Sequence, residues 1–99
     1  MNTKLKQIAD HYGQYHQGIK TLEELGELQL AILGMLKGED TLEHVTEEIA
    51  DVYVMLLQLK YLFDISQVDV AVVMQRKIDR QLERIANNGR EKNVCENNN

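Results

Sequence analysis

The sequence has no proline and no tryptophan, and it holds only one phenylalanine and six glycines among its 99 residues. Leucine, glutamate and glutamine are among the most frequent residues instead, and together with alanine, isoleucine and lysine they form a helical composition. Such a composition excludes a β-sandwich or a β-barrel. We therefore predict an all-α fold.

Cysteine is nearly absent as well. Cys95 stands alone, so it cannot form an intrachain disulfide, and no Cys and His spacing suits zinc. No apolar stretch of signal-peptide length follows the start, and the longest uninterrupted apolar run, residues 52–57, is too short to cross a membrane. We expect a cytoplasmic protein without a membrane partner.

Positive charge is scarce, because 11 Lys and Arg face 16 Asp and Glu and give a formal net charge of -5. Nucleic-acid polymers and anionic membranes need a basic surface, so both are excluded as nonspecific partners. An anionic ligand would have to come with a cation. At this length the chain is one domain with a small core, and we expect a homodimer or homotetramer to add buried surface.

Apolar periodicity and helix-end signals indicate four helical segments, over residues 3–12, 19–36, 42–63 and 66–89. Gly13 and Gly18 separate the first two, and the short connection 38–41 forces the second and third into an antiparallel pair. We predict an antiparallel helical bundle of about four helices. It forms one domain over residues 1–90, followed by a polar, disordered tail at 91–99.

The third segment carries a bundle seam of apolar residues at alternating spacings of four and three. Its members are Val45, Ile49, Val52, Leu56, Leu59 and Phe63. Further apolar residues widen this stripe beyond what one neighbouring helix needs. We expect the third segment to contact another subunit as well as its own chain.

Two carboxylate clusters, at residues 23–27 and 47–51, lie in the second and third segments. Residues three apart share a helix face, which pairs Glu24 with Glu27 and Glu48 with Asp51. The antiparallel connection places both pairs at a similar height. The sequence therefore brings four carboxylates together.

A solvated helix face is the ordinary explanation for one glutamate cluster. The second cluster favours metal binding, because Asp51 stands at the entrance to the most apolar run and an unpaired buried carboxylate is costly. An all-carboxylate site selects Mg²⁺, with Mn²⁺ as the alternative, and implies a polyphosphate substrate. A di-iron bundle is excluded because none of the three histidines follows a glutamate by three residues.

The fourth segment offers cations for such a substrate. Lys77, Arg80 and Arg84 form a basic stripe beside its apolar face. The alternative is a solvated face in which Asp79 and Glu83 are their helix partners. For the polar and aromatic residues near Gly13, local packing is favoured over contact with a base; these are His11, Tyr12, Tyr15, His16 and Gln17.

The order of these motifs resembles that of the MazG-type all-α nucleoside triphosphate pyrophosphohydrolases. The resemblance rests on Glu-Glu-x-x-Glu at residues 23–27, Glu-x-x-Asp at 48–51 and the segment 77–84, and it covers residues 18–84. The chain departs from the family at Gln81, where the family often carries Asn, and in lacking a clear base-reading motif.

The resemblance implies Mg²⁺-dependent hydrolysis of a standard or modified nucleoside triphosphate to the monophosphate and pyrophosphate. It assigns the metal ligands as Glu24, Glu27, Glu48 and Asp51, and the outer ligands or water-orienting catalytic groups as Glu23 and Glu47. The substrate-binding residues are Lys77, Arg80, Gln81 and Arg84. It also implies a dimer or tetramer.

Two alternatives stay open. Phosphoribosyl-ATP pyrophosphatase is a relative of similar length, although the turn between the second and third segments and the region around Lys77 fit it less well. A noncatalytic helical-bundle interaction module, whose acidic face binds a partner, belongs to another class. It predicts no metal dependence.

Overall fold

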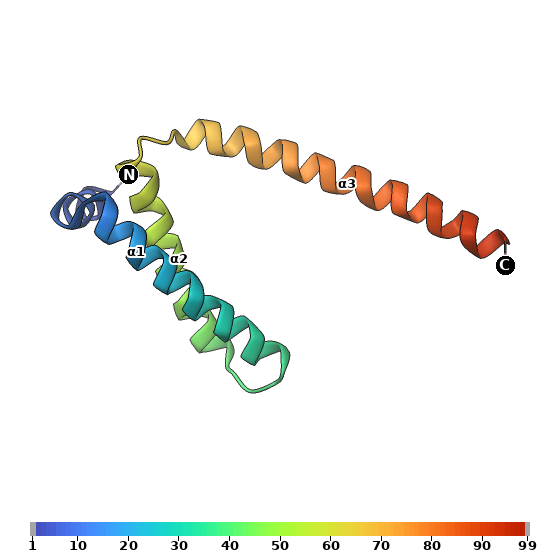
Figure 1. Cartoon of the computed structure of the whole chain (residues 1–99), viewed down its shortest axis with the longest axis horizontal. Helices are drawn as coiled ribbons and strands as arrows, with labels where there is room; N and C mark the ends of the chain where they lie inside the picture. The colour runs from blue at the N-terminus through green and yellow to red at the C-terminus, as the bar shows by residue number, and fades with distance from the viewer. Residues whose placement is uncertain (1, 99) are drawn as a thin grey trace. The chain divides into compact units, whose positions relative to one another are not determined.

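The computed structural model describes the backbone of residues 2–98 and the side chains of residues 2–89. The described residues form three helices and no strand: α1 (Thr3–Leu36), α2 (Leu42–Leu62) and α3 (Gln67–Asn98) (Figure 1). The chain divides into two compact units, Met1–Ile65 and Ser66–Asn99. The all-α prediction is confirmed, and the bundle of about four helices is not.

The helix count differs because only one of the two glycines breaks the first helix. Gly13 has φ 81° and ψ 175°, a backbone conformation that is essentially restricted to glycine, and it kinks α1. Gly18 lies within the helix. At the other end, α3 continues past Gly89, where the sequence predicts its end.

A tight turn joins α1 to α2 and makes the two helices an antiparallel pair (Figure 1). Gly38 adopts φ 73°, and its N–H donates to the Met35 carbonyl at 3.1 Å. Thr41 then caps α2, because its Oγ1 accepts from the His44 N–H at 3.1 Å. The predicted antiparallel connection is confirmed.

The helices meet along an inner seam with alternating three- and four-residue spacing. On α1 the buried and half-buried seam residues are Gln17, Thr21, Glu24, Leu28, Ala31 and Met35, and on α2 they are Val45, Glu48, Val52, Met55, Leu59 and Leu62. One buried polar pair crosses between the helices: the Gln17 Nε2 donates to Oε1 of Gln58, a residue that is 2% exposed, at 2.7 Å. Three of the six residues predicted for the seam of α2 belong to it.

The other three predicted seam residues, Ile49, Leu56 and Phe63, are exposed. Each directly follows an inner-seam residue, as do several exposed apolar residues of α1. Positions that follow the seam fall on one side of an antiparallel pair. We call this set the apolar side; it consists of Leu22, Leu25, Ile32, Leu36, Ile49, Tyr53, Leu56 and Phe63.

The kink at Gly13 lets residues 3–12 contact the end of α2. Tyr61 donates its hydroxyl to Asp10 at 2.8 Å, and this hydrogen bond raises the pKa of Tyr61. The Gln14 Nε2 donates to the Leu62 carbonyl at 2.8 Å, one of the carbonyls that a helix end leaves without a helical partner. These contacts fix the N-terminal segment to the pair.

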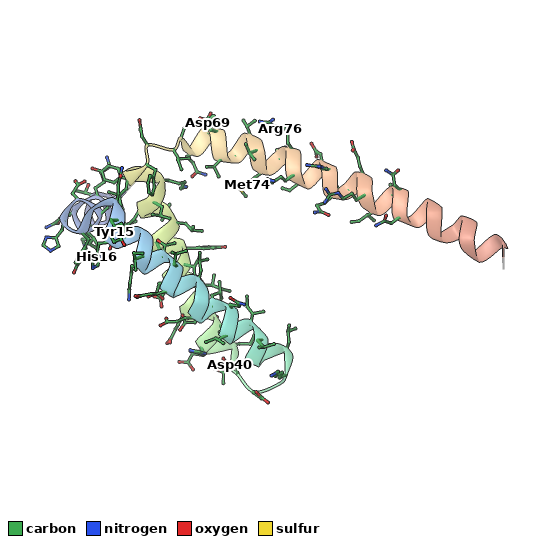
Figure 2. All side chains as sticks on the ribbon, in the orientation of Figure 1. Tyr15, His16, Asp40, Asp69, Met74 and Arg76 are labelled. Carbon is green, nitrogen blue, oxygen red and sulfur yellow. The ribbon has the colours of Figure 1, made fainter. Side chains whose placement is uncertain are left out.

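The second unit consists of α3. Ser66 Oγ accepts from the N–H groups of Val68 and Asp69 at 3.2 and 3.4 Å and so caps the start of α3. Met74 and Arg76 lie on different sides of this helix (Figure 2). Among the described residues, no helix combines the length and apolar character that crossing a membrane requires.

Candidate metal centre

Three carboxylates converge between α1 and α2. Glu24, Glu27 and Glu48 each offer an oxygen, and these oxygens lie within 4.8 Å of one another. Glu24 and Glu48 belong to the inner seam, whereas Glu27 is exposed one helical turn beyond Glu24. The turn length places the two helices so that these residues lie at one height, as predicted.

Each of the two seam glutamates has one oxygen held and the other unpaired. Glu24 Oε1 lies 3.3 Å from Lys20 Nζ, and Glu48 Oε1 lies 3.3 Å from His44 Nε2. The Oε2 atoms of both are buried and have no hydrogen-bond partner. Glu24 is 8% exposed. A divalent cation would satisfy both oxygens and offset the cost of burying them.

The three carboxylates repel one another, and this repulsion affects Glu27, the exposed one. The charges of Glu24 and then Glu48 raise the pKa of Glu27 above its usual value. On the other side, a hydrogen bond to Glu24 raises the pKa of Lys20. One lysine among three carboxylates leaves the centre net negative. The donor set is all oxygen and suits Mg²⁺ or Mn²⁺.

The remaining predicted carboxylates lie outside this group. Asp51 is exposed, so the expectation that it is buried beside the apolar run is wrong. The reason is rotational: it directly precedes buried Val52, and the helix turns its side chain away from the inner seam. Glu47 is exposed, and Glu23 is exposed and paired with Lys20 at 3.6 Å.

The predicted substrate-binding residues lie on α3, in the second unit. Lys77, Arg80, Gln81 and Arg84 are all exposed. Lys77 and Arg80 line a shallow hollow together with Arg76 and Val73. Arg76 is not part of the basic stripe predicted from the sequence, although its four-residue offset from Arg80 indicates a shared helix face.

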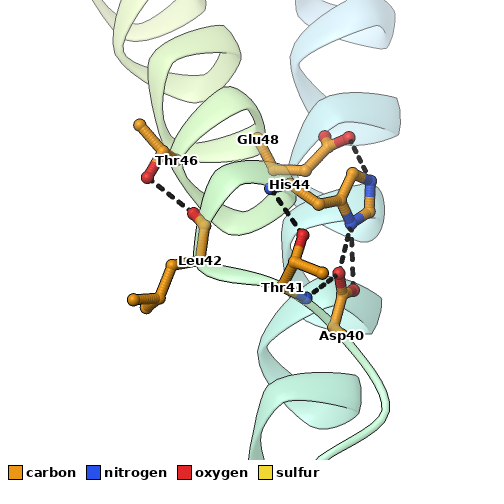
Figure 3. A network of polar contacts seen from close by, with 6 residues as sticks. All are labelled: Asp40, Thr41, Leu42, His44, Thr46 and Glu48. Atoms are coloured by element: carbon orange, nitrogen blue, oxygen red, sulfur yellow. Dashed lines mark hydrogen bonds and ion pairs between the residues drawn. The ribbon is translucent and has the colours of Figure 1, made fainter.

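A further group that was not predicted from the sequence lies where the turn leads into α2. There Asp40, His44 and Glu48 form a chain of contacts (Figure 3). His44 Nδ1 lies 2.8 and 2.9 Å from the two oxygens of Asp40. The hydrogen bond to His44, and then the one from the Thr41 N–H, lowers the pKa of Asp40, and the same contact with Asp40 raises the pKa of His44. The two successive four-residue spacings could have revealed this group, although Asp40 precedes the helix and lies in the turn.

The residues near Gly13 make local contacts, as favoured from the sequence. Tyr12 stacks on His16 at 4.5 Å between ring centroids and meets His11 edge-on at 4.7 Å. His16 Nδ1 lies 2.8 Å from Gln17 Oε1. Tyr15 is 84% exposed; it and His16 are labelled in Figure 2.

Comparison with known proteins adds no relative. No protein-family model matches the chain, and no match is found among curated proteins or solved structures.

Proposed function

We propose that this protein is a Mg²⁺-dependent hydrolase of the MazG type, which converts a nucleoside triphosphate to the monophosphate and pyrophosphate. The observation that carries the proposal is the pair of buried, unpaired Oε2 atoms on Glu24 and Glu48. Their exposed neighbour Glu27 completes three converging oxygen donors. Buried carboxylate oxygens without donors are costly in a protein that binds no cation.

In this proposal Glu24, Glu27 and Glu48 hold the ion. Asp51 joins them on the resemblance alone, and Glu23 and Glu47 orient the attacking water. Bound Mg²⁺ supplies charge neutralisation for the phosphates and a lowered pKa for water. Mn²⁺ would substitute in the same oxygen set.

The phosphate-binding groups of the proposal are Lys77, Arg80 and Arg84, and Gln81 is included among the substrate-binding residues on the resemblance alone. Their support is the charge distribution along the chain. Residues 1–65 hold eleven Asp and Glu against five Lys and Arg, whereas residues 66–99 hold five against six. The acidic hairpin thus suits the cation, whereas α3 carries cationic side chains without an excess of negative charge and so suits the phosphates.

The proposal is tested by measuring pyrophosphate release over a panel of standard and modified nucleoside triphosphates with Mg²⁺ or Mn²⁺. We expect release that depends on the metal and stops with a chelator. Phosphoribosyl-ATP belongs in the same panel, since its exclusive turnover would favour the histidine-biosynthesis activity. Turnover of none of them, together with no metal binding by calorimetry, would favour a noncatalytic interaction module.

We also propose that two copies of the chain pack their apolar sides against each other. The buried apolar core of the described residues is small, consisting of Ala9, Ala31, Val52 and Met55. A stable two-helix pair needs more burial than this. The apolar side repeats the seam spacing on both helices, which is the pattern of packing in a four-helix arrangement.

This arrangement predicts that Leu56→Glu lowers the mass measured by light scattering to that of a monomer. Leu56 lies on the apolar side, and a buried carboxylate there would lack a partner. Leu30→Glu is the matched control, because Leu30 is equally apolar and is 70% exposed on the other side of α1. Its mass should stay that of the parent. A parent protein that is itself monomeric would contradict the proposal.

The raised pKa of Glu27 gives a pH prediction for metal binding. The carboxylate is ionised above its pKa, and below it the metal must displace a proton. Because the pKa of Glu27 lies above the usual glutamate value, we expect Mn²⁺ affinity to fall at a higher pH than an ordinary glutamate would produce. Calorimetry between pH 7.5 and 5 in two buffers of different ionisation enthalpy measures the released proton.

The Glu27→Gln variant cannot release the proton that the metal displaces from Glu27. It should bind Mn²⁺ more weakly, and its Mn²⁺ affinity should depend less on pH. Equal proton release by the variant and the parent would contradict the assignment of the proton to Glu27.

A further inference from the structure

We infer that His44 is a positioning residue that holds the Glu48 carboxylate in the orientation that the metal centre needs, and that Asp40 in turn holds His44. This inference rests on the proposed metal centre. It assigns a role to two residues that the carboxylate motifs do not include.

The first step is the contact between His44 and Glu48. The imidazole Nε2 lies 3.3 Å from Glu48 Oε1, whereas Oε2 of the same carboxylate is buried and unpaired. The terminal torsion of a glutamate is broad, so a free carboxylate would exchange its oxygens. With Oε1 engaged by the ring, Oε2 stays available for a cation.

The second step is the fixation of the ring. Nδ1 of His44 lies 2.8 and 2.9 Å from the two Asp40 oxygens, so the ring cannot turn without losing both contacts (Figure 3). Both ring nitrogens therefore face carboxylates. His44 has no nitrogen left to bind the ion itself, and its effect must pass through Glu48.

The third step is the fixation of Asp40 by the turn. The Thr41 N–H donates to Asp40 Oδ1 at 2.7 Å. On its other side Asp40 lies against Gly34, where an added Cβ would come within 3.2 Å of the Asp40 Cβ and 3.3 Å of Oδ2. A larger residue at position 34 would push Asp40 away. The turn is thus connected to the metal ligand through Asp40 and His44.

The contact of Lys20 with Glu24 differs from the contact of His44 with Glu48. Lys20 Nζ also holds one oxygen of a seam glutamate at 3.3 Å, but its second contact, with Glu23 Oε2, is longer at 3.6 Å and goes to an exposed side chain. A long, flexible ammonium neutralises charge without fixing an orientation. The imidazole, held on both sides, fixes the direction of Glu48.

The test is a double-mutant cycle on the full chain, with Mn²⁺ as the probe and its affinity measured by calorimetry. We expect His44→Ala to weaken Mn²⁺ binding by about tenfold, the lower end of the range for partners of metal ligands. In a Glu48→Gln background the same substitution should change the affinity less than twofold, because the ligand through which it acts is already altered. His44→Gln keeps a donor for Glu48 and should recover part of the affinity.

His11→Ala is the matched control, since His11 is an exposed histidine of the same unit and contacts Tyr12 instead of a carboxylate. It should bind Mn²⁺ like the parent. Gly34→Ala, which leaves every carboxylate in place, should weaken binding in the same direction as His44→Ala. Circular dichroism on each variant reports whether the helices are retained.

The outcomes separate the inference from the proposed function. If the parent binds Mn²⁺ and His44→Ala binds it equally well, the metal centre stands and the inference is wrong. A loss of the same size in the parent and Glu48→Gln backgrounds would also overturn it, since His44 would then act through the general fold. A parent that binds no Mn²⁺ would overturn both.

Discussion

Replacing Glu48 with Gln is expected to lower pyrophosphate release by at least about 100-fold while the helices stay intact. Glu48 contributes one of the two buried, unpaired oxygens of the candidate centre. The amide is a poorer ligand and carries no charge, so it weakens metal binding and removes most of the activation of the attacking water. The effect is measured as pyrophosphate release with saturating Mg²⁺, detected as phosphate after an added pyrophosphatase cleaves the pyrophosphate.

The fold should tolerate this change, because Glu48 is surrounded by like charges. Its closest acidic neighbours are Glu24 and Glu27, and removing one carboxylate relieves their repulsion. The amide oxygen can still accept from His44. Chemical denaturation should therefore give a free energy of unfolding at least equal to that of the parent protein.

Glu43→Gln is the matched control, since Glu43 is an exposed glutamate in the first turn of the same helix. Its turnover should equal that of the parent. Loss of helicity in Glu48→Gln, or equal turnover in the two variants, would move Glu48 out of the catalytic centre.

Replacing Gly13 with Ala is expected to lower the free energy of unfolding by about 1–3 kcal/mol. Gly13 sits at φ 81° and ψ 175°, where a Cβ strains the backbone even though no atom lies within 4 Å of it. The alternative for the variant is a straightened α1, which would pull residues 3–12 away from Tyr61 and Leu62. Urea unfolding followed by circular dichroism measures the loss.

Gly18→Ala is the natural comparison. Gly18 lies in regular helix five residues later and also has open space around it. There alanine should raise the free energy of unfolding by about 0.5–1 kcal/mol, because glycine in a helix interior carries an entropic cost. Changes of the same sign at both positions would mean that the kink at Gly13 is not part of the stable fold.

The sequence predicted the position of the carboxylates along the helix axes better than the side of each helix on which they lie. The connection 38–41 was enough to bring Glu27 level with Glu48, since helix rise and turn length are nearly fixed quantities. Rotation about the helix axis was harder to predict, because the second half of α2 is apolar nearly all round and the helix offers two seams with the same spacing. The predicted seam included Ile49 and Leu56, whereas the structure buries Glu48 and Met55 instead.

Which face of a helix is buried depends on the residues of the other helix that it meets. The sequence of one helix alone does not contain this information. Gln58 is buried because Gln17 of the other helix meets it. The two glycines of α1 illustrate the same limit: Gly13 and Gly18 look equivalent in sequence, and contacts made by Asp10 and Gln14 select the first as the kink. Asp51 was predicted to be buried and is exposed for the same reason: the rotation of α2 depends on its contacts with α1.

The contacts of residues 3–12 with the end of α2 have a consequence for the order of folding. The bonds of Asp10 to Tyr61 and of Gln14 to Leu62 span 51 and 48 positions, whereas the Asp40 and His44 contact spans four. Closing a long loop costs more chain entropy and takes longer than closing a turn. We therefore expect the turn to form first, the seam to close outward from it, and the N-terminal segment to dock last. For the same reason we expect this segment to be the first part of the hairpin to open, so that its amide hydrogens exchange with solvent before those near the carboxylates.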